Sequence, residues 1–243
     1  MQKILILIIS FIAIPLFADN NLKINIFFNP ELDKDKVMSG DAGELIKKNV
    51  ADTIRAEKII IAAGKIFSTK QDSFYADLLD RLPFDQVIPT DFDVASAFSN
   101  SSVINRGNMG SATISTFFFD SLSVAVGAIY SPDYLVKNKF SQEGSKFGDP
   151  FADSRAMMQK MQSFDVKILF VGLSKTIALD MLAQLKHKPD YLVSFDYKFN
   201  GSQTVGKTSY ISLRDNKKYG ILIDFFSVNG ELKSKYSKIE LKR

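Results

Sequence analysis

Hydrophobic and polar positions alternate along this chain in two different rhythms. Short apolar runs of strand length predict buried β-strands, and between them lie longer stretches whose apolar residues recur every three or four positions, as on one face of an α-helix. The predicted strands are residues 22–28, 58–64, 84–90, 165–174 and 191–193. The predicted helices are residues 42–57, 72–82, 149–164 and 175–188. The third helix is expected to begin with Asp149 as N-cap and Pro150 in its first turn. This alternation predicts an α/β sheet protein.

A different pattern interrupts the alternation. Residues 101–105 and 112–132 alternate with period two and are rich in β-branched and aromatic side chains, which predicts a β-rich stretch with a hairpin. Its FFFD segment, residues 117–120, is either core or an exposed hydrophobic edge that would imply a partner. The end of the chain, from residue 207 onward, predicts antiparallel strands with Asn229-Gly230 as a hairpin turn.

The first eighteen residues have the pattern of a secretory signal peptide. Lys3 supplies the positive charge, the run ILILIISFIAI supplies the apolar segment, and the stretch ends in the small residue Ala18. We therefore expect export, cleavage near Ala18, and a mature chain of residues 19–243 with no membrane span, in the periplasm or at the surface of a bacterial cell. The alternative is an uncleaved N-terminal anchor, for which the apolar run is short.

Composition narrows the classes of protein further. The chain has no cysteine, which excludes disulfides, a lipid-anchored cysteine and a cysteine nucleophile. Its 46% hydrophobic content is ample for a core, and we expect one domain after the leader. The net charge of +4 falls to +3 without Lys3, the one charged residue of the leader. Because nucleic-acid binding needs a denser basic patch with interleaved aromatic residues, no nucleic-acid partner is expected.

Candidate functional residues stand where the predicted strands end, because in open α/β sheets this is where ligands bind. The candidate cleft residues, which could bind an anion, are Asn29, Lys65, Asn105, Ser174 and Lys198. The carboxylates at comparable positions are Asp91, Asp93 and Asp196.

The order of these elements, and the segments at their ends, resemble the calcineurin-like metallophosphoesterases, most of all the catalytic domain of exported bacterial 5′-nucleotidases. The resemblance spans residues 22–243 and rests on six segments: FNPEL, IIIAAGK, VIPTDFD, VIN, ILFVGLSK and PDYLVSFDYK. It implies layered β-sheets flanked by helices. In that family these segments carry the Asp, His and Asn ligands of two divalent metal ions, whose bridging hydroxide attacks phosphorus.

The metal-ligand motifs of the family are lost in this chain. The family's ligands fall on or near Pro30, Leu32, Lys65, Thr90, Asp91, Ser174, Asp196 and Lys198. Proline and leucine offer a metal no donor atom, and lysine brings a competing positive charge. We therefore expect no metal cofactor. The alternative is one Mn or Zn ion held by Asp91, Asp93 and Asp196.

The lysines at the strand ends could supply the positive charge that metal ions supply in the family. Carboxylates left without their dications are costly in a partly buried pocket. Lys65 and Lys198 could restore the balance by pairing with Asp91, Asp93 or Asp196. The cleft is then either filled by salt bridges or adapted to hold an anionic small molecule.

Two other candidates for chemistry lie in unsuitable contexts. GSQTVGKT, residues 201–208, fits the phosphate-binding pattern G-x4-GKT letter for letter, but a P-loop leads into a helix and the following TSYISL predicts a strand. His187, the single histidine, lies at the end of a predicted helix, where capping or solvent exposure is expected. It is badly placed for a Ser-His-Asp arrangement.

These observations lead to three hypotheses of function. The first is an exported, catalytically degenerate 5′-nucleotidase-like protein that acts as a binding or interaction protein in the cell envelope, with an anionic small molecule or an envelope protein as partner. The second is a phosphoesterase whose site is rebuilt around one metal ion or around lysine-assisted chemistry. The third is a structural envelope protein without a ligand.

Overall fold

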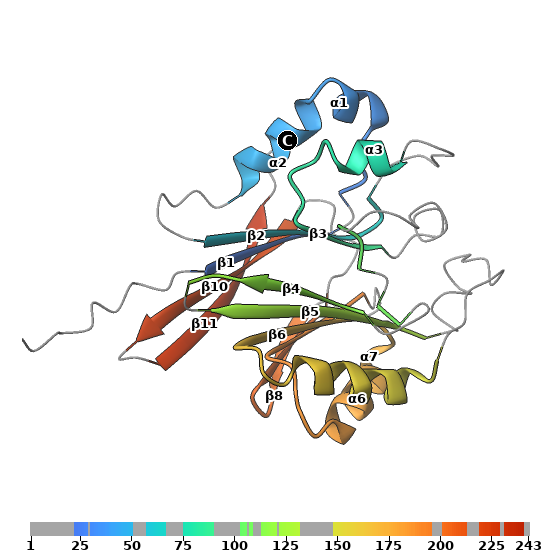
Figure 1. The fold of residues 1–243 in the computed structure, drawn as a ribbon, viewed down its shortest axis with the longest axis vertical. Helices are drawn as coiled ribbons and strands as arrows, with labels where there is room; N and C mark the ends of the chain where they lie inside the picture. The colour runs from blue at the N-terminus through green and yellow to red at the C-terminus, as the bar shows by residue number, and fades with distance from the viewer. Residues whose placement is uncertain are drawn as a thin grey trace, which may run out of the picture.

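Two β-sheets pack face to face in the described part of the chain, with helices on both outer sides (Figure 1). The computed structural model describes residues 22–28, 30–50, 57–66, 75–89, 103–105, 107–108, 113–120, 122–131, 148–195, 201–212, 219–228 and 231–240. This arrangement confirms the predicted α/β class and the layered β-sheets flanked by helices.

The first sheet has the strand order β11-β10-β1-β2-β3. Its strands are β1 (Leu22–Phe28), β2 (Glu57–Gly64), β3 (Gln86–Pro89), β10 (Tyr219–Val228) and β11 (Glu231–Glu240). β1, β2 and β3 run parallel, whereas β10 pairs antiparallel with both β1 and β11. The C-terminal hairpin therefore completes the sheet that the first strand begins.

The second sheet has the strand order β4-β5-β6-β7-β9-β8. Its strands are β4 (Ile114–Phe118), β5 (Ser123–Tyr130), β6 (Val166–Gly172), β7 (Tyr191–Ser194), β8 (Gly201–Val205) and β9 (Thr208–Ser212). The four central strands run parallel, and the two edge strands β4 and β8 are antiparallel to their neighbours. The predicted hairpin within residues 112–132 is confirmed as β4 and β5.

Alternate side chains of both sheets fill the space between them. Ile24 and Ile61 from the first sheet meet Val126 and Phe170 from the second in one fully buried cluster. The other side chains of the parallel strands point to the opposite face, where those of β1, β2 and β3 and those of β5, β6, β7 and β9 pack under the helices. Burial on both faces explains why most of the parallel strands appear in the sequence as nearly continuous apolar runs.

Helices cover the outer face of each sheet (Figure 1). The helices on the first sheet are α1 (Lys34–Met38), α2 (Asp41–Asn49) and α3 (Tyr75–Leu79). They bury Val37 and Ile46 in a cluster with Phe27 of β1 and Ala62 of β2. The helices on the second sheet are α6 (Pro150–Met161) and α7 (Lys175–Gln184), and they supply a layer of buried methionines.

Helix starts were predicted better than helix ends. As predicted, α6 begins at an N-cap, because the Asp149 carboxylate accepts hydrogen bonds from the N–H groups of Phe151 (3.3 Å) and Ala152 (3.0 Å). The helix predicted over residues 42–57 is wrong at its end: α2 ends at Asn49, Val50 is extended and Glu57 already belongs to β2, while residues 51–56 lie outside the described residues. The short helix α1 was not predicted.

Residues 201–212 form a β-hairpin rather than a P-loop. β8 and β9 pair antiparallel from Gly201↔Ser212 to Val205↔Thr208, with Gly206 at φ +63° in the tight turn between them. No helix follows the glycine, so nothing presents an N-terminus to a phosphate. The prediction that TSYISL forms a strand is confirmed over residues 208–212.

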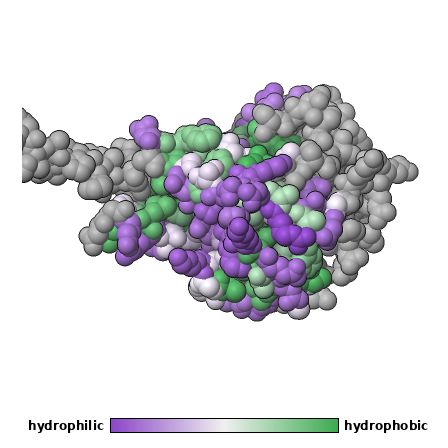
Figure 2. All heavy atoms as spheres, turned by 60° about the horizontal axis from the view of Figure 1, so that its bottom comes forward, coloured by the Kyte–Doolittle hydropathy of each residue, from purple (hydrophilic) through white to green (hydrophobic). Residues whose placement is uncertain are grey.

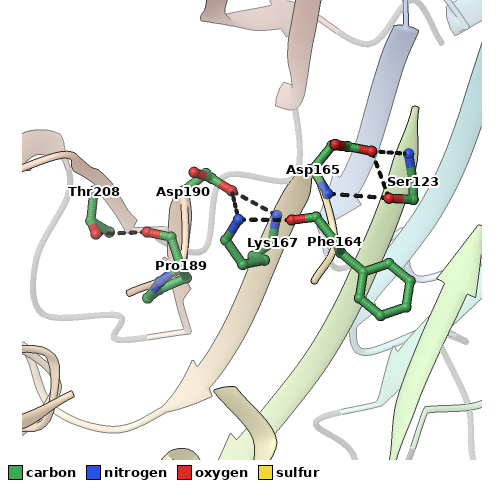
Figure 3. Close-up of polar contacts among 7 residues, drawn as sticks. All are labelled: Ser123, Phe164, Asp165, Lys167, Pro189, Asp190 and Thr208. Atoms are coloured by element: carbon green, nitrogen blue, oxygen red, sulfur yellow. Dashed lines mark hydrogen bonds and ion pairs between the residues drawn. The ribbon is translucent and has the colours of Figure 1, made fainter. Parts of the chain in front are cut away.

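Aspartates fix the register at the end of the molecule where the parallel strands begin (Figure 3). The Asp165 carboxylate accepts hydrogen bonds from the Ser123 N–H (2.8 Å) and hydroxyl (2.6 Å), which ties β6 to β5. Asp190 accepts one from the Lys167 N–H (2.8 Å) and forms an ion pair with its ammonium group (3.3 Å). The Asp85 carboxylate accepts a hydrogen bond from the Ile60 N–H of β2 (2.7 Å). We name this end the amino edge.

The amino edge also contains His187, which follows α7 and precedes β7. It therefore lies at the opposite end of the strands from the predicted cleft. Figure 2 turns the α6 and α7 side toward the viewer and shows hydrophilic side chains over most of its middle, with small hydrophobic areas between them. None of the helices in the described residues is long and apolar enough to cross a membrane.

Candidate functional site

The carboxyl ends of parallel strands from both sheets meet at one edge of the molecule. Phe28, the last residue of β1, stacks on Phe195, the first residue after β7, with ring centroids 6.0 Å apart. Tyr130, the last residue of β5, donates a hydrogen bond of 2.7 Å from its hydroxyl to the carbonyl of Pro89 at the end of β3. This carboxyl edge is where the sequence placed the candidate cleft.

Aromatic rings close the inter-sheet space at the carboxyl edge. Phe195 is 2% exposed and stacks on Phe170 (5.8 Å, 23° between planes) and on Tyr130 (6.4 Å, 1°), in addition to Phe28. We call these four residues the aromatic cluster. Their side chains offer one hydroxyl, on Tyr130, and that group is used to join the two sheets. The cluster therefore packs like core and presents almost no polar atom to a ligand.

Asn105 is buried at 2% exposure between the edges of the two sheets. Its amide nitrogen donates to the Ser115 hydroxyl (3.0 Å) and to the Val126 carbonyl (2.9 Å), and its amide oxygen accepts from the Gly107 N–H (2.8 Å). Both amide hydrogens of Asn105 thus join the segment beside β3 to β4 and β5 of the second sheet. The oxygen that a metal ion would need already accepts a hydrogen bond.

Asn108 has a parallel role that the sequence did not reveal. Its amide oxygen accepts from the Tyr130 N–H (2.8 Å), while its nitrogen donates to the Tyr130 carbonyl (3.1 Å) and to the Asp153 carboxylate on α6 (3.1 Å). The backbone must approach closely here, since a Cβ on Gly107 would lie 2.0 Å from the Ala128 carbonyl oxygen. The segment Asn-x-Gly-Asn was the available signal, because it combines two amide side chains with a glycine.

Lys65 follows β2 at the carboxyl edge, where the loops after β1 and β2 run together. Its carbonyl accepts from the Glu31 N–H (3.2 Å), and the Ile66 carbonyl accepts from the Leu32 N–H (2.7 Å). Glu31 has φ +44°, the left-handed region. The Leu32 side chain is 8% exposed and packs in the apolar cluster under the helices, so this position turns away from the space between the sheets.

Ser174 lies two residues after the end of β6 at Gly172 and is the N-cap residue of α7. Its carbonyl accepts from the Ala178 N–H (2.8 Å), while its exposed side chain makes no capping hydrogen bond. Nearby, the Ser194 hydroxyl donates to the Leu173 carbonyl (3.3 Å) and ties the end of β7 to that of β6. The structure therefore brings Ser174 and Lys65 to the carboxyl edge, at the ends of strands in different sheets.

The other predicted site residues fall outside the described residues. They are Asn29, Asp91, Asp93, Asp196 and Lys198. The pairing of lysines with carboxylates in a filled cleft, and the one-metal alternative, therefore stay predictions.

The described positions do not fit the family's two-metal centre. Leu32 offers no donor atom, Lys65 is a cation, and the amide of Asn105 is held by three hydrogen bonds. Within the ranges that the structure describes, no three His, Cys, Asp or Glu side chains are grouped so that they could hold a metal ion.

Solved structures of similar fold connect this arrangement to known proteins, although the sequence matches no protein-family model and no curated protein. A Staphylococcus aureus protein assigned as a 5′-nucleotidase, in complex with alpha-ketoglutarate, aligns at 9% identity with a TM-score of 0.67, over 91% of this chain and 54% of that one. The NAD nucleotidase of Haemophilus influenzae aligns at 10% identity with a TM-score of 0.62, over 92% and 56%.

A third similar structure is GAP50, described as the anchor in the inner membrane complex of Plasmodium. It aligns at 12% identity with a TM-score of 0.51, over 92% of this chain and 90% of that one. The chain thus spans about half the length of the two nucleotidases and nearly all of GAP50. At these identities the comparisons show the fold alone.

Proposed function

Since the chain has the fold of the calcineurin-like metallophosphoesterases, we propose that it is an exported, catalytically degenerate 5′-nucleotidase-like protein that acts as a binding or interaction protein in the bacterial cell envelope. It consists of a signal peptide, residues 1–18, and one metallophosphoesterase-like domain, residues 19–243. In this proposal the protein binds a partner and does not hydrolyse phosphoesters.

The aromatic cluster is the single observation that carries this proposal. A two-metal phosphoesterase needs several oxygen or imidazole donors converging where the strands of its two sheets end. Here Phe28, Phe170 and Phe195 stack at that place, and the one hydroxyl among them, on Tyr130, is bonded to the Pro89 carbonyl. Ring packing of this kind stabilises the fold, and the described side chains of the aromatic cluster bring no carboxylate or imidazole donor to this place.

A protein of similar fold supports a role in attachment. GAP50 is described as an anchor, and the present chain covers 90% of its length. It shows that this architecture can serve attachment. We propose the same class of role here, with an envelope protein or an anionic small molecule as the partner.

An anionic ligand would bind at the outer rim of the carboxyl edge, above the aromatic cluster. Lys65 and Ser174 lie at that rim, and Asn29 and Lys198 are assigned to it by sequence position. A lysine ammonium and a hydroxyl suit a carboxylate or phosphate group. Asn105 is the least suitable of the candidate cleft residues, because its amide already makes three hydrogen bonds.

Metal retention tests the proposal. The purified protein is equilibrated with Mn²⁺ or Zn²⁺, desalted and subjected to elemental analysis, and its Tm is measured with and without each ion. We expect no retained metal and no rise in Tm. Retention of one or two equivalents, together with a rise in Tm, would overturn the degenerate site, because an ion at 100 times its Kd stabilises the folded state by about 2.7 kcal/mol.

A matched variant separates a site from stray binding. If the wild-type protein retains metal, Asp196→Asn would lose it in the one-metal phosphoesterase and keep it if the ion binds elsewhere on the surface. Hydrolysis of nucleotides and simple phosphoesters by the wild-type protein but not by Asp196→Asn would establish the enzyme alternative. If anionic ligands raise the Tm of wild type but not of Lys65→Ala, the rim is the ligand site.

A further inference from the structure

β4 is an edge strand that exposes a large aromatic side chain. Phe118 is 73% exposed, the highest value among the large hydrophobic residues that the structure describes. Its ring lies 5.9 Å from that of Phe164, which is half-buried after α6. Phe117 and Phe119, by contrast, point the other way and pack against the inter-sheet core. The segment FFFD is therefore both core and exposed edge.

β4 lacks the protection that the edge strands of the first sheet have. Edge strands are usually blunted by charges, prolines or covering segments. The edge strand β11 carries exposed lysines at positions 233, 235 and 238. β3 ends in a proline, and Ile104 bridges to Val87 on its outer side. β8, GSQTV, is uncharged like β4 but carries no aromatic side chain. Residues 112–119, ATISTFFF, contain no charge, no proline and no glycine.

The pattern of hydrogen bonds in the β4–β5 hairpin shows which backbone N–H and C=O groups of β4 point away from β5. Phe119 and Leu122 exchange both of their N–H···O=C bonds across the turn. In an antiparallel pair such positions alternate with positions whose backbone groups point away from the neighbour. From the register Phe118↔Ser123, Thr116↔Ala125 and Ile114↔Gly127, the outward groups belong to Ile114, Thr116 and Phe118. No strand among the described residues pairs with this side of β4.

We propose that β4 pairs antiparallel with β4 of a second copy of this chain, with the two-fold axis passing through Thr116. This register joins all the outward backbone groups of β4 in hydrogen bonds, because Thr116 meets the partner's Thr116 and Phe118 meets the partner's Ile114. An aromatic residue opposite a β-branched residue is a favourable cross-strand pair. The two six-stranded sheets become one continuous sheet, and the contact is isologous, as a two-fold dimer requires.

The self-complementary order of its outward residues, Ile114, Thr116 and Phe118, favours a second copy as the partner. The strand is uncharged, so self-pairing brings no like charges together, whereas β11 pairing with itself would oppose lysines to lysines. Phe164 beside Phe118 extends the apolar surface that the partner's Ile114 would cover. A five-residue strand makes a small contact, so we expect a dimer that dissociates on dilution.

Sedimentation velocity of the full-length protein over about 1 µM to 1 mM tests the association, since this range spans the Kd of weak interfaces. We expect a concentration-dependent dimer in the wild-type protein. Phe118→Glu should raise the dimer Kd at least about tenfold, because two carboxylates are brought into an apolar contact. Ile177→Glu on α7, where the residue is 40% exposed, is the matched control and should dimerise as wild type. A monomer at every concentration, or equal Kd values for wild type and Phe118→Glu, would overturn the proposal.

Engineered cysteines test the register, because the natural chain contains no cysteine. Opposed residues of a hydrogen-bonded antiparallel pair have Cα atoms about 5.5 Å apart, within the range for a disulfide. Under mild oxidation Thr116→Cys should give covalent dimers on a non-reducing gel. Thr204→Cys, on the edge strand β8 of the same sheet, should stay monomeric. If wild type dimerises but Thr116→Cys does not cross-link, or Thr204→Cys cross-links equally, the dimer uses another surface and the proposal is wrong.

Discussion

Removing the ring of Phe195 should destabilise the protein strongly. The side chain is 2% exposed and stacks on three other rings at 5.8, 6.0 and 6.4 Å. A buried Phe→Ala change costs about 3–5 kcal/mol, and each aromatic contact adds about 0.5–1.5 kcal/mol beyond area burial. We therefore expect Phe195→Ala to lower the free energy of unfolding by about 4 kcal/mol, and the Tm by about 8–16 °C for a domain of this size.

Urea unfolding followed by far-UV circular dichroism measures this loss. Phe195→Leu is the graded control, because it keeps much of the buried volume but no ring, and it should cost about 1–2 kcal/mol. A loss below about 1 kcal/mol for Phe195→Ala would refute the argument, since it would mean that the ring does not close the core at the carboxyl edge. The cavity in Phe195→Ala is lined by rings, so this variant should not gain Mn²⁺ binding.

Three smaller changes test other parts of the structure by urea unfolding. Gly107→Ala should cost more than about 2 kcal/mol, because φ is +57° and the new Cβ would meet the Ala128 carbonyl. Asn105→Ala should cost about 2–4 kcal/mol through three lost hydrogen bonds. Burial raises the pKa of the Asp85 carboxyl above its usual 3.8, against the hydrogen bond from Ile60 that lowers it. The wild type should therefore lose stability as pH rises through that pKa, and Asp85→Asn should remove this slope.

The central parallel strands could be predicted from the sequence because both of their faces are buried. An apolar run such as Val166–Gly172 indicates a strand whatever surrounds it, and the local cap at Asp149 indicates the start of α6. The end of α2 could not be predicted in this way. Residues 50–57 carry no strong helix stop, and the boundary follows from where β2 must begin in order to pair with β1.

The candidate site could be located by its strand ends but not described. Asn105 was identified as a polar residue at the correct edge, yet its partners Ser115 and Val126 lie 10 and 21 positions away and cannot be inferred from spacing. Phe195 gave no signal, because a phenylalanine after an apolar strand is common. Only the meeting of two sheets shows that it stacks on rings from three other strands.

The pairing of β1 with β10 has a consequence for how the chain folds. Ile24 and Ile223 are register partners although they are about 200 positions apart, a separation that makes closure of this sheet slow. The first strand to leave the ribosome has its antiparallel neighbour only when the last strands have been made. Until then the first sheet lacks β10 and β11, two of its five strands, and cannot be completed. That delay suits a polypeptide threaded through an export channel, which is the route that its predicted leader implies.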